Sequence, residues 1–215
     1  DLALAARTCV ASRLINAGQS CIAAKRFLVV RAVAREFTAL VVAEMRAKTM
    51  GDPRTPVDLG PQARADLRAA LHAQVTRSAA QGACCLLGGE LPAGRGYFYP
   101  PTVLAGVTPG MPAFDEELFG PVGALVEAAD ERELVRLANA TAYGLGAAVF
   151  SRDAARATRL AVDELECGSV FVNDFVRSDP RLPFGGIKAS GFGRELGLPG
   201  LREFTNAKAV VVRTE

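Results

Sequence analysis

The chain has 215 residues, half of them hydrophobic and 22% charged, with a formal net charge of +2. This composition excludes a disordered chain, because the apolar content is high and the net charge is small. No apolar stretch approaches the length of about 18 residues that a membrane span needs. The 25 basic residues are scattered among 23 acidic ones, so neither a membrane nor a nucleic acid is an expected partner.

Strands and helices are predicted to alternate along the chain. A buried helix is predicted over Leu2–Leu14, where Arg7 and Arg13 are the polar interruptions of an apolar run. A β-branched run at Arg26–Arg31 is typical of a covered parallel strand. Apolar residues then recur at helical spacing in Val33–Met45, Leu67–Val75, Leu134–Ala138 and Ala154–Leu165, and a short helix is expected around Leu201.

Further strands are predicted at Cys84–Leu87, Thr102–Val107, Val122–Val126, Ala147–Phe150, Ser169–Val172 and Ala209–Val212. Strands that alternate with helical stretches indicate an α/β fold with a mostly parallel sheet flanked by helices. No repeat and no linker divides the chain, so we expect one domain.

The cysteines are five in number and show no CxxC spacing. This pattern favours a reducing, cytoplasmic setting in which most of them are small packing residues. Cys84 and Cys85 are expected to pack in their strand. Cys21 differs, because it follows Asn16-Ala-Gly-Gln-Ser in a loop between a buried helix and a buried strand. Open α/β sheets place their chemistry at strand ends, and Gly18 permits a turn that aims amide groups at an oxyanion, so Cys21 is a candidate nucleophile.

Metal and phosphate sites find little support. His72 is the single histidine and is interpreted as a surface or packing residue, so no histidine-based metal site is expected. Gly191–Gly197 spaces its third glycine too widely for a dinucleotide-binding loop, and no glycine motif is followed by Lys-Ser or Lys-Thr. Nothing in the chain is predicted to cradle a dinucleotide pyrophosphate.

Two more clusters are candidate binding sites. In Glu116–Pro121, two carboxylates beside an aromatic residue could bind sugar hydroxyls and stack on a flat ring; the alternative is a solvated acidic turn. In Arg177–Gly186, positive charge, a hydroxyl and an aromatic side chain suit a small anionic ligand; the alternative is an ordinary polar loop.

The three clusters, in this order, resemble the aldehyde dehydrogenase superfamily. Asn16–Cys21 is similar to its catalytic-cysteine motif and Glu117–Val122 to its cofactor-binding motif, while Phe171–Asn173 and Pro183–Gly191 resemble its closing segments. The likeness runs along the whole chain. It is strongest to bacterial NAD(P)-dependent succinate-semialdehyde dehydrogenases, and the stretches that carry it are Cys21–Phe27, Tyr99–Leu104, Leu165–Gly168 and Ser178–Arg181.

The resemblance implies a role for each cluster. Cys21 would attack the aldehyde carbon and give a thiohemiacetal, hydride would pass to NAD or NADP, and water would cleave the remaining thioester. The backbone N–H of Cys21 would supply one arm of the oxyanion hole. Glu117 would hydrogen-bond the nicotinamide ribose, and Phe119 would pack near the ring.

The implied substrate is an aldehyde, with succinate semialdehyde as the first candidate. Some succinate-semialdehyde enzymes have an arginine where this chain has Ile15. Another residue would therefore have to bind the substrate carboxylate. The candidates for substrate binding are Arg177, Ser178, Arg181 and Phe184, because arginine binds a carboxylate through two hydrogen bonds.

By the same resemblance, residues 1–205 form the cysteine-bearing catalytic domain, and residues 206–215 a C-terminal strand for homo-oligomer assembly. The nucleotide-binding domain, the general-base glutamate and an oxyanion asparagine would precede Asp1, so the 215 residues alone are expected to be inactive. Two alternatives stay open: a dehydrogenase for another aldehyde, or a non-catalytic oligomerisation module. A cysteine hydrolase is disfavoured, since no second histidine accompanies the thiol.

Overall fold

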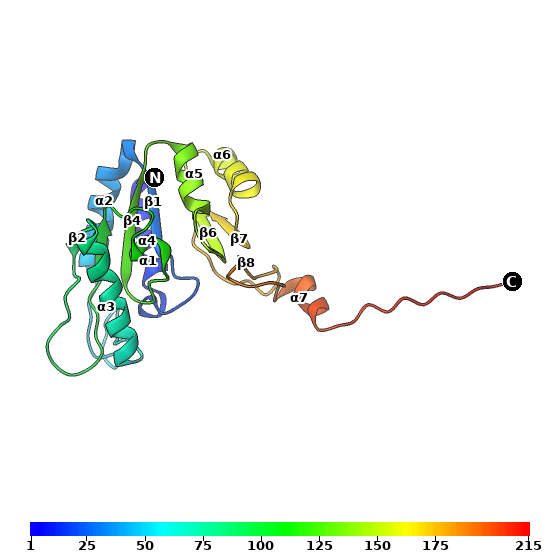
Figure 1. The fold of residues 1–215 in the computed structure, drawn as a ribbon, viewed down its shortest axis with the longest axis horizontal. Coiled ribbons are helices and arrows are strands. Elements are labelled where there is room, and N and C mark those ends of the chain that lie inside the picture. The colour runs from blue at the N-terminus through cyan, green and yellow to red at the C-terminus, as the bar shows by residue number, and fades with distance from the viewer.

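A four-stranded mixed sheet forms the main body of the computed structural model, which describes residues 1–215 (Figure 1). Its strand order is β1-β4-β3-β2. The strands β1 (Arg26–Val30), β4 (Val122–Ala128) and β3 (Thr102–Ala105) run parallel to one another, and β2 (Cys84–Leu87) is the edge strand, antiparallel to β3. The predicted α/β fold with a mostly parallel sheet is therefore confirmed.

Helices cover both faces of this sheet, as the nearly continuous burial of its central strands β3 and β4 requires. On one face, α1 (Leu2–Arg13) and α2 (Arg31–Arg46) contribute to an apolar cluster that includes Val103 and Leu125. The other face packs against α3 (Ala65–Ala80), α4 (Pro112–Asp115) and α5 (Glu131–Asn139). Adjacent strand residues such as Val103 and Leu104 belong to different clusters, because successive side chains of a strand point to opposite faces.

A second, smaller group of strands follows α5. Here β6 (Gly146–Val149) and β7 (Ser169–Val172) pair in parallel, and α6 (Ala154–Arg159), which continues as a π-helical turn at Leu160–Glu164, connects them. The short strands β5 (Tyr143–Gly144) and β8 (Ile187–Lys188) pair in antiparallel fashion, and α7 (Gly197–Glu203) is the last helix. No helix of the chain combines the length and the apolar character that crossing a membrane requires.

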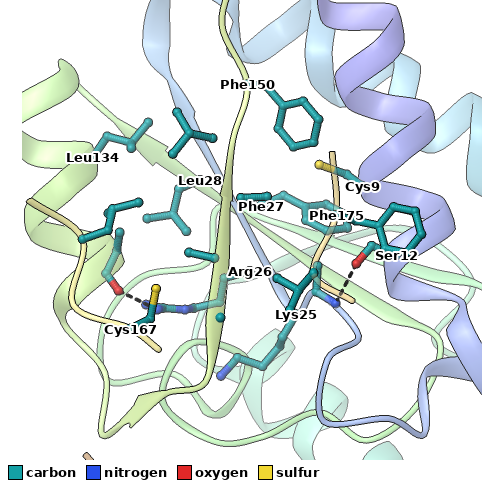
Figure 2. A pocket seen from close by; sticks show the side chains of 18 of the residues that line it. Cys9, Ser12, Lys25, Arg26, Phe27, Leu28, Leu134, Phe150, Cys167 and Phe175 are labelled. Atoms are coloured by element: carbon teal, nitrogen blue, oxygen red, sulfur yellow. Dashed lines mark hydrogen bonds between the residues drawn. The ribbon is translucent and has the colours of Figure 1, made fainter. Parts of the chain in front are cut away.

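A cavity of about 600 Å³ lies between the two groups of strands and is lined by residues of both β1 and β6. Figure 2 shows apolar side chains from both groups around it, among them Phe27, Leu28, Leu134 and Phe150. The cavity also reaches Cys21 and Glu117. It therefore connects the core of the fold to two of the candidate site residues.

Two predictions about local structure are wrong for the single chain. Ala209–Val212 forms no strand: the residues after α7 extend away from the body (Figure 1), and Val211 is 93% exposed. A strand needs a neighbour for its backbone N–H and C=O groups, and no segment of this chain lies beside these residues. Cys84 and Cys85 are exposed rather than packed, because β2 is the edge of the sheet.

Candidate active site

Cys21 is exposed and follows a tight turn at the end of α1. The turn is the 3-10 segment Ile15–Gly18, in which Asn16, Ala17 and Gly18 have φ angles of 50°, 53° and 77°. Such left-handed conformations cost about 1 kcal/mol for a residue with a side chain. Surrounding contacts must therefore hold the turn that leads to the thiol.

Side chains of the turn supply some of these contacts. The side-chain amide of Asn16 donates to the carbonyl oxygen of Gln19 at 3.1 Å, and the side-chain amide of Gln19 donates to the carbonyl of Asn16 at 3.2 Å. The Gln19 side-chain oxygen accepts from the backbone N–H of Ala63 at 2.8 Å. These bonds close the turn on itself and tie it to the segment before α3.

Gly18 packs against the backbone of Gly120. A Cβ atom on Gly18 would lie only 2.1 Å from the Gly120 carbonyl oxygen, so no side chain fits there. This contact brings together the cysteine turn and the Glu117–Gly120 segment, which are far apart in the sequence. Within that segment Leu118 is buried, whereas Glu117 and Phe119 are exposed. The structure thus places the first two predicted clusters side by side.

Lys25 connects the other side of the cysteine loop to the residues just before the Glu117–Gly120 segment. Its Nζ donates to the carbonyl oxygens of Phe114, at 2.8 Å, and Glu116. Burial lowers the pKa of Lys25 to about 8, and the charge of neighbouring Arg26 acts in the same direction. The Lys25 and Arg26 side chains both emerge from the start of β1 (Figure 2).

Arg13 is a buried site residue that the sequence analysis treated only as an interruption of the helix. Its side chain is 1% exposed, and Nη2 donates to the carbonyl oxygen of Gly18 at 2.7 Å. Burial lowers the pKa of Arg13 to about 10, and the charge of Glu117 opposes this shift. The sequence did contain a signal for Arg13, namely an arginine on an apolar helix directly before a glycine-containing turn.

The third predicted cluster lies outside the cavity that Cys21 lines. Arg181 forms a two-point ion pair with Asp179, with nitrogen–oxygen distances of 2.9 and 2.6 Å, and is 86% exposed. Arg177 pairs with Asp174 at 2.7 Å. Ser178 is exposed, and half-buried Phe184 pairs its backbone with Glu195. The structure therefore does not bring this cluster to Cys21.

His72 lies outside the cavity, whereas Cys9 and Cys167 (Figure 2) line it together with Cys21. His72 Nδ1 lies 3.3 Å from the Tyr99 hydroxyl, a contact that suits a packing role. Burial raises the pKa of Cys9 to about 12 and also raises the pKa of Cys167. No three His, Cys, Asp or Glu side chains gather where they could hold a metal ion.

The site therefore consists of an exposed thiol on a braced turn, packed against a segment that carries an exposed carboxylate and an exposed aromatic ring. The aldehyde dehydrogenase family model matches residues 1–210, so the chain belongs to the aldehyde dehydrogenase family. The resemblance that the sequence motifs indicate is thereby confirmed.

Individual relatives support the same assignment. The chain is 52% identical to succinate semialdehyde dehydrogenase [NAD(P)+] Sad of Escherichia coli, over 98% of this chain and 46% of that protein. It is 45% identical to succinate-semialdehyde dehydrogenase [NADP(+)] 1 of Mycobacterium ulcerans, over 99% of this chain and 46% of that protein. The crystal structure of succinic semialdehyde dehydrogenase from Streptococcus pyogenes with NADP+ superposes with a TM-score of 0.95 at 36% identity. The superposition covers 100% of this chain and 47% of that one. The chain thus spans about half the length of these relatives.

Gly18→Ala tests the backbone contact beneath Cys21. We expect it to lower the free energy of unfolding by ~2 kcal/mol or more, because the methyl group overlaps the Gly120 carbonyl. Gly106→Ala is the matched control, since Gly106 has a similar φ of 67° but open space around its Cβ position, and should cost only about 1 kcal/mol. Chemical denaturation measures both. Equal losses in the two variants would contradict a close contact at Gly18.

The lowered pKa of Lys25 predicts that the free energy of unfolding rises with pH. Its pKa is about 8 in the folded chain and near 10.5 ordinarily. Between these values the unfolded chain binds the proton and the folded chain does not, so stability rises with pH and falls as pH drops through about 8. The gain should be about 2 kcal/mol. Chemical denaturation of the wild type and of Lys25→Met at pH 7.5 and pH 10 measures this gain in the free energy of unfolding. Only the wild type should show the gain. A parallel pH response in both proteins would refute the assignment to Lys25.

Proposed function

We propose that the protein is an NAD(P)-dependent aldehyde dehydrogenase in which Cys21 is the nucleophile. The observation that carries this proposal is the packing of the cysteine turn against the Glu117–Gly120 segment through Gly18 and Gly120. It holds an exposed thiol near an exposed carboxylate and ring, in a chain of the aldehyde dehydrogenase family.

The chemistry assigned to Cys21 takes place in three steps. The thiolate Sγ bonds to the aldehyde carbon, and the carbonyl oxygen becomes an oxyanion that the backbone N–H of Cys21 can stabilise. The oxyanion re-forms the C=O bond as hydride leaves the carbon, and a thioester on Cys21 remains. Water then adds to the thioester carbon, the C–S bond breaks to regenerate the Cys21 thiolate, and the acid leaves as its carboxylate, so that two protons are released.

The residues near Cys21 fit the nicotinamide end of NAD or NADP. When bound, this cofactor accepts the hydride. The exposed Glu117 carboxylate can accept hydrogen bonds from ribose hydroxyls, and the exposed ring of Phe119 can pack near the nicotinamide. Choice between NAD and NADP is left open, because both occur among the names of the relatives.

Succinate semialdehyde is the proposed substrate, on the strength of the relatives' names. Ser178, Arg181 and Phe184 are proposed to bind it, with Arg177 as a second candidate for its carboxylate. Because Arg181 is already paired with Asp179, the substrate carboxylate would have to replace that partner. Another aldehyde is the alternative, since Ile15 offers no charge at its position.

The wider organisation is also part of the proposal. We propose that residues 1–205 act as the catalytic domain together with a nucleotide-binding domain elsewhere in a longer, cytoplasmic protein. The exposed apolar residues Val210, Val211 and Val212 support a role for residues 206–215 in homo-oligomer assembly. A purely structural, non-catalytic module remains the competing function for the isolated chain.

Cys21→Ser in the full-length protein tests the nucleophile. We expect the turnover of succinate semialdehyde with NAD or NADP to fall by at least ~10³-fold, since removing a nucleophile removes the covalent route. Cys84→Ser changes a second exposed cysteine and should leave turnover unchanged. Residues 1–215 alone should show no turnover. Full activity of Cys21→Ser would rule out the proposed nucleophile, and turnover by residues 1–215 would rule out the need for a second domain.

Arg181→Ala tests the substrate. In the full-length protein we expect kcat/KM for succinate semialdehyde to fall by ~10- to 100-fold, which is the effect of losing one hydrogen bond to a charged group. The kcat/KM for propanal, which has no carboxylate, should stay unchanged. Arg64→Ala is the matched control, because Arg64 forms the same kind of close ion pair with Asp66. An unchanged kcat/KM for succinate semialdehyde would remove Arg181 from the site.

A further inference from the structure

Arg13 and Ser12, the last buried residues of α1, contact the chain on both sides of Cys21. Arg13 Nη2 donates to the Gly18 carbonyl oxygen at 2.7 Å, and Ser12 Oγ accepts from the backbone N–H of Ala24 at 3.3 Å. Figure 2 shows the bond from Ser12. One rigid helix end therefore holds the loop at a point before the thiol and a point after it.

The environment of Arg13 is unusual for an arginine that only stabilises a fold. The side chain is 1% exposed and has no ion-pair partner at contact distance, and its Nε and Nη1 atoms have no hydrogen-bond partner. Burying a guanidinium this way is costly. A buried Leu or Met at this position would fill the core without that cost, so the charge and the single bond to Gly18 require another explanation.

Gln62 shows the same arrangement on the neighbouring carbonyl. Its side chain is 2% exposed, and Nε2 donates to the Ala17 carbonyl oxygen at 3.3 Å. Two buried polar side chains thus hold two consecutive carbonyls of a turn whose φ angles are left-handed. Because the peptide planes of this turn set the direction of the chain that follows, these bonds help to fix the path of the chain toward Cys21.

We propose that Arg13 is a positioning residue for Cys21, acting from α1 through its hydrogen bond to the Gly18 carbonyl. This inference rests on the proposed function, because it concerns the same thiol. Arg13 contacts no reacting atom. It holds the left-handed turn against Gly120 and keeps a positive charge beneath the cysteine loop, where it also lies within electrostatic reach of Glu117.

The test compares two cysteines in one molecule. In the full-length protein, iodoacetamide labelling followed by peptide mass spectrometry gives the alkylation rate of Cys21 relative to that of Cys84, which is exposed on the remote edge strand β2. We expect Arg13→Met to lower this ratio by about 10-fold, since a small misplacement of a reacting group has effects of this order or larger. Arg13→Lys keeps a donor and the charge, so it should lower the ratio by only about 2- to 3-fold. Arg7→Met, at an exposed position of the same helix, should not change it.

Turnover gives a second readout that a merely stabilising role would not move. For the folded Arg13→Met protein we expect kcat to fall while the KM for the nicotinamide cofactor stays unchanged, with partial recovery in Arg13→Lys. If Arg13→Met does not fold, Arg13→Lys decides: a lower Cys21 to Cys84 ratio supports the proposal, and a wild-type ratio overturns it. A wild-type ratio in folded Arg13→Met also overturns it.

These outcomes are separable from a failure of the proposed function. If Cys21→Ser keeps full turnover, Cys21 is not the nucleophile, whatever Arg13 does. If Cys21→Ser is inactive while Arg13→Met keeps the wild-type ratio and kcat, the nucleophile stands and the positioning role of Arg13 is wrong.

Discussion

The contact between Gly18 and Gly120 is the constraint on which the rest of the site depends. It brings two backbones so close that a Cβ on Gly18 would overlap the Gly120 carbonyl. Turns normally move more freely than the elements they join, but a turn held this way cannot shift without moving the Glu117–Gly120 segment. The cysteine turn and the Glu117–Gly120 segment, which we propose to carry the nucleophile and the cofactor-facing residues, therefore behave as one unit although they are far apart in the sequence.

A buried arginine and a half-buried lysine hold this unit by bonding to carbonyl oxygens rather than to carboxylates. Arg13 donates to Gly18, and Lys25 donates to Phe114 and Glu116. A carbonyl dipole offsets less of the desolvation cost than a full negative charge does, and burial accordingly lowers the pKa of both side chains. The arrangement is expensive in stability, but it leaves the nearby carboxylate of Glu117 free to meet a ligand.

Local patterns predicted most of the fold, and the motifs at Cys21 and Glu117 marked two segments that the fold brings together. The run at Arg26–Val30 forms a strand whose residues alternate between buried and half-buried, so both faces are at least partly covered, as its apolar residues indicate. Arg13 was missed because its role depends on a tertiary contact, and a helix pattern shows only that an interruption exists. The strand expected at Ala209–Val212 failed for a related reason: β-propensity describes a surface that fits a neighbour, and this chain supplies none. Cys84 and Cys85 were misjudged because their strand lies at a sheet edge, which its own sequence does not reveal.

The pairing of Arg181 with Asp179 bears on how a carboxylate substrate could be recognised. The two residues are close in sequence, and Arg181 lowers the pKa of Asp179, so the carboxylate keeps its charge at neutral pH. An ion pair this exposed contributes little to stability, because water solvates both partners almost as well when they separate. A substrate carboxylate could therefore replace Asp179 at small cost, provided that the loop carried Arg181 into a less hydrated place. Recognition by this arginine thus depends less on forming the bond than on bringing the exposed Arg177–Gly186 loop toward the cavity that Cys21 lines.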